Sequence, residues 1–143
     1  MALPTFVARA VRTRASFCCE YCLLPAQASV IPFEIDHIIA RKHGGPSDSD
    51  NLALSCFYCN SAKGPNIAGV DSETGLIVPL YHPRQHLWQE HFIIEGTRIV
   101  AKTSAGRATI AVLEMNAEDM MLLLGSLIDE GLYPPRFDNR ANP

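Results

Sequence analysis

The sequence lacks two features that would assign it to a membrane or to a strongly cationic surface. No apolar run approaches the eighteen or so residues that a transmembrane helix needs. Lysine and arginine together number 12 against 15 acidic residues, which gives a formal net charge of −3. Because cationic side chains supply most of the non-specific affinity for nucleic acid, this balance does not by itself indicate a nucleic-acid-binding protein. We therefore predict a soluble protein that does not contact a membrane.

The sequence contains five cysteines, an odd number. Four of the five form two C-x-x-C pairs, Cys19 with Cys22 and Cys56 with Cys59. This spacing lets both thiolates of a pair reach one tetrahedral zinc ion at about 2.3 Å. A structural zinc site and a reducing, cytoplasmic location are therefore favoured over a disulfide framework. Cys18 could replace Cys19 as a ligand, although only Cys19 gives the two-residue spacing.

The interval between the two pairs, residues 23–55, is longer than the fifteen to twenty or so residues of a plain zinc ribbon. Asp36 and His37 lie at its centre, a hard oxygen ligand beside a proton acceptor suited to neutral pH. Asn60 follows the second pair directly and offers an amide oxygen. These three side chains could build a second and different metal site.

At these positions the sequence resembles the HNH endonucleases, whose ββα-metal finger is often flanked by two cysteine pairs around a structural zinc. The resemblance covers Cys19 to Gly64, about a third of the chain. The matching elements are Glu34-x-Asp36-His37-Ile38, Gly44-Gly45, Asn51-Leu52 and Leu54-x-Cys56-x-x-Cys59-Asn60-x-x-Lys63-Gly64. Asn60 stands where the family name has its last histidine, so the chain would be an H-N-N variant.

The resemblance implies a metal-dependent endonuclease that hydrolyses DNA. His37 would be the general base, while Asp36 and Asn60 would hold Mg²⁺ or Mn²⁺ and Asn51 would orient the loop. A regular strand sends Asp36 and His37 to opposite faces, so both can serve one centre only if the strand bends or ends there. The alternative is a catalytically silent, zinc-stabilised module that binds nucleic acid or protein, which the acidic balance slightly favours.

We predict an α+β fold that forms one domain over residues 1–143, with an HNH finger core at 17–66 and a C-terminal extension at 67–143 packed on it. Hydrophobic periodicity and turn residues predict helices over 4–16 and 57–63 and strands over 30–40 and 52–56. In the extension they predict an edge strand at 76–81 and a hairpin from 92–94 and 98–102. Residues 106–114 fit either a helix or a strand, and Asn116 would begin the last helix, with Asp119 in the capping-box position.

Several further polar residues have two interpretations each. His82, His86 and His91 have some of the spacing of metal ligands, but we favour core or surface histidines because the sequence shows no partner ligands. Glu34 could orient a metal ligand or simply lie exposed. Arg84 could contact phosphate, and phosphate contacts and plain solvated surface are the alternatives for His43 and Lys63.

Overall fold

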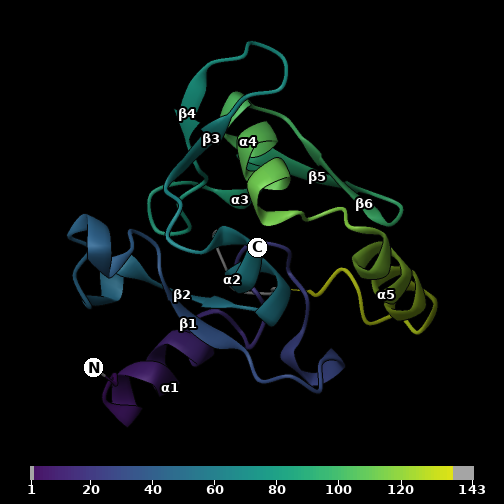
Figure 1. Ribbon diagram of the computed structural model, residues 1–143. Coiled ribbons are helices and arrows are strands. Elements are labelled where there is room, and N and C mark those ends of the chain that lie inside the picture. Colours follow the sequence, from purple (N-terminus) through teal and green to yellow (C-terminus); the bar gives the residue numbers. More distant parts are fainter. Residues whose placement is uncertain (1, 137–143) are drawn as a thin grey trace.

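The first half of the chain folds in the order strand, strand, helix that was predicted for the finger. The computed structural model describes residues 2–136. Its first half contains α1 (Thr5–Arg14), β1 (Glu34–His37), β2 (Leu52–Ser55), α2 (Phe57–Lys63) and the short 3₁₀ helices η1 (Ala26–Ala28), η2 (Arg41–His43) and η3 (Ser49–Asn51). β1 and β2 pair antiparallel, and α2 crosses them at the centre of the molecule (Figure 1).

β1 is much shorter than the strand predicted over 30–40, and that prediction was wrong in extent. Asp36 pairs with Ala53 and His37 with Leu52, and the strand ends at His37. Beyond this point the N–H of Ile39 donates to the side chain of Asn51 instead of a strand carbonyl, at 2.9 Å. The two residues predicted for chemistry therefore lie at the strand end.

Residues 67–136 add two more antiparallel hairpins and three helices. Their elements are β3 (Ala68–Val70), β4 (Ile77–Pro79), α3 (Trp88–His91), β5 (Phe92–Glu95), β6 (Arg98–Ala101), α4 (Ser104–Leu113) and α5 (Glu118–Asp129). β3 pairs with β4 and β5 with β6, which confirms the hairpin predicted around residues 95–97. Residues 106–114, left open by the sequence, lie almost entirely in α4, whose first turn is capped by the Thr103 hydroxyl.

The start of α5 differs from the prediction. Its N-cap is Ala117, which offers no side-chain hydrogen bond. Asn116 instead accepts from the N–H of Ile99 and donates to the carbonyl of Ile99, both at 2.8 Å. Asn116 does not begin the helix because its amide pairs with the β6 backbone. Within residues 2–136, the Asp119 carboxylate accepts a hydrogen bond from the N–H of Met120 and not from that of Asn116, so no capping box forms.

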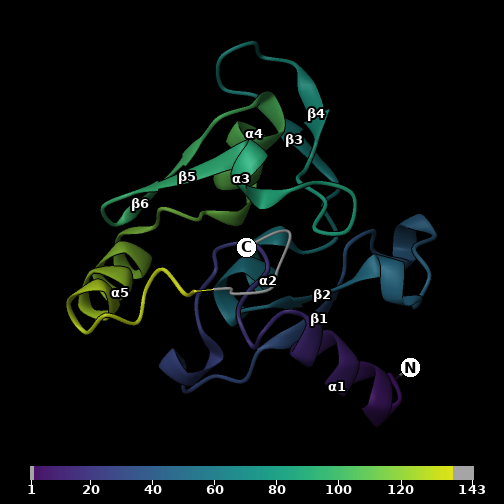
Figure 2. The same ribbon diagram turned by 180° about the vertical axis from the view of Figure 1, so that it is seen from behind.

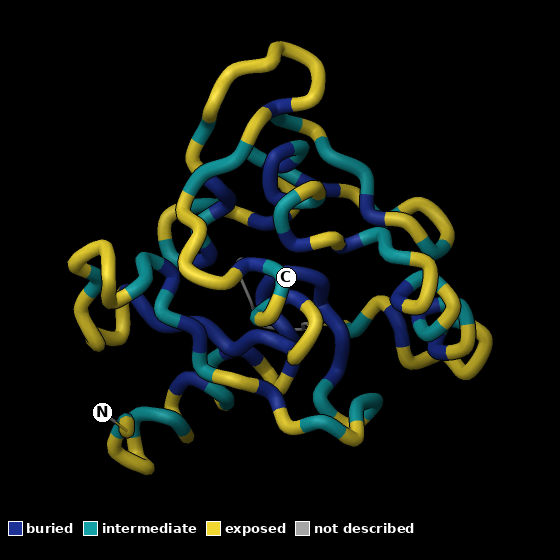
Figure 3. The backbone as a smooth tube through the Cα atoms, in the orientation of Figure 1, coloured by how far each residue is buried: buried dark blue, intermediate teal, exposed yellow. Residues whose placement is uncertain are grey.

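The two halves meet over the turn from Cys19 to Cys22, here called the knuckle, and over α2, where the backbone is deeply buried (Figure 3). α4 packs on α2, and the indole N–H of Trp88 donates to the carbonyl of Tyr21 at 2.8 Å. The Tyr133 hydroxyl donates to the carbonyl of Cys22, also at 2.8 Å. Contacts from distant parts of the extension therefore hold the Cys19 to Cys22 turn in place.

Arg84 belongs to the same contact between the halves. Its guanidinium pairs with the buried carboxylate of Glu20, which also accepts from the N–H of Leu54 at 2.9 Å. The predicted phosphate contact for Arg84 is therefore wrong, because the cation is used to join the extension to the knuckle. Separately, none of the helices between residues 2 and 136 has the length and apolarity needed to span a membrane.

Candidate active site and metal centre

The four paired cysteines form a cluster that fits a zinc ion. Their sulfur atoms all lie within 4.8 Å of one another, and each cysteine is at most 1% exposed. The sulfurs of Cys22 and Cys56 are 3.7 Å apart, close to the edge of about 3.8 Å of a regular tetrahedron with arms of about 2.3 Å. Backbone N–H groups of Cys22 and Cys59 donate to the sulfurs of Cys19 and Cys56, which turns both thiolates of each pair to one side.

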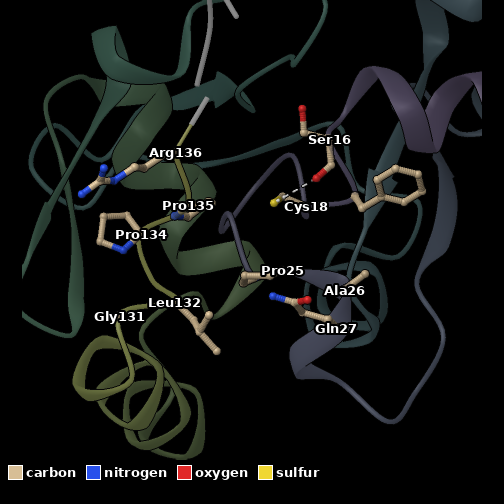
Figure 4. A pocket seen from close by; sticks show the side chains of 11 residues that line it. Ser16, Cys18, Pro25, Ala26, Gln27, Gly131, Leu132, Pro134, Pro135 and Arg136 are labelled. Carbon is tan, nitrogen blue, oxygen red and sulfur yellow. Dashed lines mark hydrogen bonds between the residues drawn. The ribbon is translucent and has the colours of Figure 1, made fainter. Parts of the chain in front are cut away.

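Cys18 lies outside this cluster. Its thiol donates to the carbonyl of Ser16 at 3.4 Å, so Cys19 is the ligand that the fold provides. Cys18 lines a pocket of about 630 Å³ between residues 16–18, residues 25–27 and the chain at 131–136 (Figure 4). None of the residues predicted for catalysis or metal binding lines this pocket, so its size does not mark the chemistry.

Asp36 is 6% exposed and already has two partners. The Tyr21 hydroxyl donates to its Oδ2 at 2.7 Å, and the Lys63 Nζ lies 3.1 Å from the same oxygen. Lys63 is only 1% exposed and also donates to the carbonyls of His37 and Ile38, at 3.3 and 3.0 Å. Burial raises the pKa of Asp36, and the Lys63 ammonium and the Tyr21 bond oppose that rise.

The two interpretations offered for Lys63, a phosphate contact and a solvated surface side chain, are both wrong. The ammonium is buried because it joins α2 to the end of β1, compensating one carboxylate and two carbonyl oxygens. Lys63 therefore fixes the backbone from which Asp36 and His37 project.

His37 lies at the last residue of β1 and is partly exposed. Its Nε2 is 2.9 Å from the Ser47 hydroxyl and accepts from the Arg41 Nε at 3.2 Å. Since a guanidinium can only donate, Nε2 carries a lone pair in this arrangement. Burial and the positive charge of Arg41 lower the pKa of His37, although Asp36 opposes the shift. The imidazole is therefore held in the neutral form that can accept a proton near pH 7.

Asn51 is 5% exposed and its side-chain amide is fully engaged with the loop between β1 and β2. It accepts from the N–H of Ile39 at 2.9 Å and donates to the carbonyls of Ile39 and Pro46 at 3.0 and 2.7 Å. Gly45 makes this close approach possible, because a Cβ there would lie 1.7 Å from the Ile39 carbonyl oxygen. These bonds fix the segment that follows His37.

Residues 19–66 match the sequence model of the HNH endonuclease family. The match covers about a third of the chain, and we refer to this matched segment as the HNH domain. No curated protein and no solved structure matches the chain. The matched segment contains both cysteine pairs and the residues around β1, and the family supports a nuclease-type function in general terms.

α2 of the HNH domain carries two residues of the predicted site, Cys59 and Asn60, and the buried Lys63. Cys59 and Lys63 are buried and lie on neighbouring positions of one face, facing the cysteine cluster and Asp36 respectively. Asn60 is partly exposed and three residues before Lys63, the spacing at which helical side chains are neighbours. Asn60 is thus placed beside the residue that contacts Asp36, on the side open to solvent.

We call Asp36, His37, Asn51 and Asn60 the predicted HNH site. Three residues that contact this site, Tyr21, Arg41 and Ser47, were not revealed by the sequence. Tyr21 lies within the first C-x-x-C pair, and its contact with Asp36 depends on how the knuckle packs on β1. Arg41 is four residues after His37 in a polar loop, where a sequence pattern gives no side-chain direction. Only the charge of Arg41 and the short separation could have suggested a contact.

The three histidines outside the HNH domain do not form a metal cluster. Their rings pack together and against Tyr81, with centroids 5.0 Å apart for His86 and His91 and 5.6 Å for Tyr81 and His91. Within the described part of the chain, the four cysteines are the only group of three or more suitable residues whose ligand atoms converge. Glu34 is exposed at the start of β1.

Proposed function

We propose that the protein is a metal-dependent HNH endonuclease that hydrolyses phosphodiester bonds in DNA. The observation that carries the proposal is the state of His37. At the end of β1, the unprotonated Nε2 of His37 accepts a hydrogen bond from Arg41, and this segment matches the HNH family. A neutral imidazole whose pKa is lowered by burial and a neighbouring guanidinium suits a general base near neutral pH.

In this proposal, His37 accepts a proton from the water that attacks phosphorus. The Ser47 hydroxyl lies 2.9 Å from Nε2, so that it either hydrogen-bonds the attacking water or is displaced by it. Arg41 contributes positive charge beside the reacting phosphate. Asn51 keeps the loop in register and does no chemistry itself.

Asp36 and Asn60 are proposed to hold one exchangeable divalent ion. Tyr21 and Lys63 use only part of the roughly four acceptor positions of the Asp36 carboxylate. The remaining positions and the Asn60 amide oxygen are hard oxygen ligands of the kind that Mg²⁺ and Mn²⁺ prefer. Such an ion would neutralise transition-state charge and stabilise the leaving oxygen.

DNA is the proposed partner despite the net charge of −3. η2 places exposed Arg41 and Lys42 directly after β1, next to His37. Local cations of this kind can track a phosphate backbone even on a protein that is acidic overall.

A catalytically silent, zinc-stabilised binding module is the second candidate. The observation in its favour is that the Lys63 ammonium already compensates the charge of Asp36, so the site is stable without a divalent ion. This module would bind DNA or a protein through the same surface and leave DNA uncut.

A nicking assay on supercoiled plasmid DNA, with Mg²⁺ or Mn²⁺ added, tests the proposal. We expect the zinc-loaded protein to relax the plasmid and His37→Ala to be slower by roughly a hundredfold or more. His43→Ala, an exposed histidine on the adjacent turn, is the matched control and should remain within a few-fold of the parent. A His37→Ala variant as fast as the parent rejects the mechanism. A parent that binds DNA but never cuts it supports the binding module.

A further inference from the structure

A second pocket, of about 310 Å³, opens between α2 and the corner that joins α4 to α5. Phe57 and Tyr58 line it from α2, and Glu114, Asp119 and Met120 line it from the opposite side. It contains none of the residues assigned above to zinc, the divalent ion or proton transfer.

The two aromatic rings are exposed in a way that the zinc knuckle does not require. Phe57 and Tyr58 occupy the two positions between Cys56 and Cys59, and each remains 41% exposed. Their ring centroids are 5.7 Å apart and their planes stand at 83°. Two rings at nearly a right angle form a corner, in which a small group can contact the face of one ring and the edge of the other.

The charge of this pocket is of one sign. Glu114 and Asp119 are exposed and are the charged residues that line it, while no lysine, arginine or histidine does so. Glu118, also exposed, adds another carboxylate in the first turn of α5. Phosphodiesters would be repelled here, whereas a cation would be attracted both by the carboxylates and by the aromatic rings.

The backbone of Glu114 has an unfavourable conformation for a residue with a side chain. Glu114 is the C-cap of α4 and has a φ of 52°, a left-handed conformation that glycine adopts most easily. An L-residue there costs roughly 1–2 kcal/mol. Helix stability alone would favour glycine at this position. It therefore does not explain why a glutamate, whose carboxylate lies at the rim of the pocket, is found there.

We propose that this pocket binds the guanidinium or alkylammonium group of a basic segment from a partner protein. Perpendicular aromatic rings, two carboxylates and the Met120 side chain are the chemistry that recognises such a cation. The volume lies at the small end of the range of about 300–1,000 Å³ for ligand pockets, which suits a single side chain.

The proposal does not depend on nuclease activity. α5 and the loop that carries η2 lie on opposite sides of α2, as the front and back views both show (Figure 2). A partner seated between α2 and α5 would therefore leave the His37 end of β1 open.

An NMR titration of the full-length, zinc-loaded protein tests the proposal. The probe is a six-residue peptide with one arginine among glycines, and the matched control peptide carries citrulline, which has the same shape without the charge. We expect saturable shifts at the rings of Phe57 and Tyr58 and at the Met120 methyl with the arginine peptide. The citrulline peptide, and the Glu114→Gln/Asp119→Asn variant with the arginine peptide, should bind roughly tenfold more weakly.

Zinc content and plasmid nicking should be unchanged in the Glu114→Gln/Asp119→Asn variant, since neither side chain is part of the HNH site. Equal binding of the two peptides, or shifts that never saturate, would overturn the proposal. A single-stranded oligonucleotide that shifts the same signals where the arginine peptide does not would also overturn it, and would assign the pocket to nucleic acid. A parent protein that binds the arginine peptide but shows no nuclease activity would reject the proposed function and leave this pocket's assignment intact.

Discussion

Replacing Asp36 with asparagine should destabilise the protein as well as affect its activity. The substitution keeps an oxygen for the Tyr21 hydroxyl but removes the charge that faces the Lys63 ammonium, in a pair whose side chains are 7% and 2% exposed. Breaking a buried ion pair by removing one partner costs about 3–5 kcal/mol. Lys63 keeps the carbonyls of His37 and Ile38, so we expect the lower end, about 3 kcal/mol. With a urea m value of about 1–3 kcal/mol/M, the midpoint should fall by about 1–3 M.

A double variant separates the structural role of Asp36 from its proposed role as a metal ligand. Asp36→Asn/Lys63→Met removes both charges at once, so the loss that comes from the unpaired charge should return, while the carbonyls of His37 and Ile38 lose their donor. If Asp36 also holds the divalent ion, the double variant should stay inactive in the nicking assay although it is folded. Lys63→Met alone, which leaves a buried carboxylate uncompensated, is the control for loss of the ammonium.

Two results would refute this reasoning. A urea midpoint for Asp36→Asn within experimental error of the parent would show that the ion pair does not carry the expected free energy. A double variant that regains cleavage would show that the negative charge of Asp36 is not needed to hold the divalent ion.

Other predictions address the remaining residues. Cys56→Ser should lose the zinc ion and unfold the HNH domain, because structural zinc contributes folding free energy. Metal analysis and circular dichroism measure the two effects. A variant that is folded without zinc would contradict this prediction. Cleavage should rise with pH as His37 loses its proton, with a midpoint below about pH 6.5 because burial and Arg41 lower the pKa of His37. Arg41→Gln should move this midpoint to higher pH. An unchanged pH profile in Arg41→Gln would exclude an effect of Arg41 on the His37 pKa. Asn51→Ala should lower stability by roughly 1–3 kcal/mol in urea unfolding, since it leaves buried loop groups unpaired. Asn60→Ala should raise the Mg²⁺ concentration needed for cleavage while the thermal midpoint stays nearly level, and equal Mg²⁺ dependence would remove Asn60 from the site.

The sequence predicted those features that short-range geometry determines. C-x-x-C spacing constrains both sulfurs of a pair, so the cysteine cluster follows from a local pattern. α2 ends at Lys63 as predicted, because Gly64 adopts a positive φ there. The hairpin around Gly96 is likewise a local turn signal between two β-branched segments.

Features that depend on contacts across the fold could not be read in this way. A lysine on a short helix is normally a surface residue, and only the approach of α2 to the end of β1 buries Lys63. The true length of β1 is set by the Asn51 side chain, which replaces a strand partner. Asn116 resembles a helix cap in sequence, but β6 lies close enough to take both of its hydrogen bonds.

The position of Trp88 gives the protein a spectroscopic reporter of its own. It is the single tryptophan of the chain, it is 4% exposed, and its indole donates to the Tyr21 carbonyl inside the first cysteine pair. Its emission should therefore shift to longer wavelength when the extension separates from the knuckle and water reaches the ring. Because the tryptophan emission comes from one residue, it reports on this part of the interface, and chelation of the metal can be followed without any label.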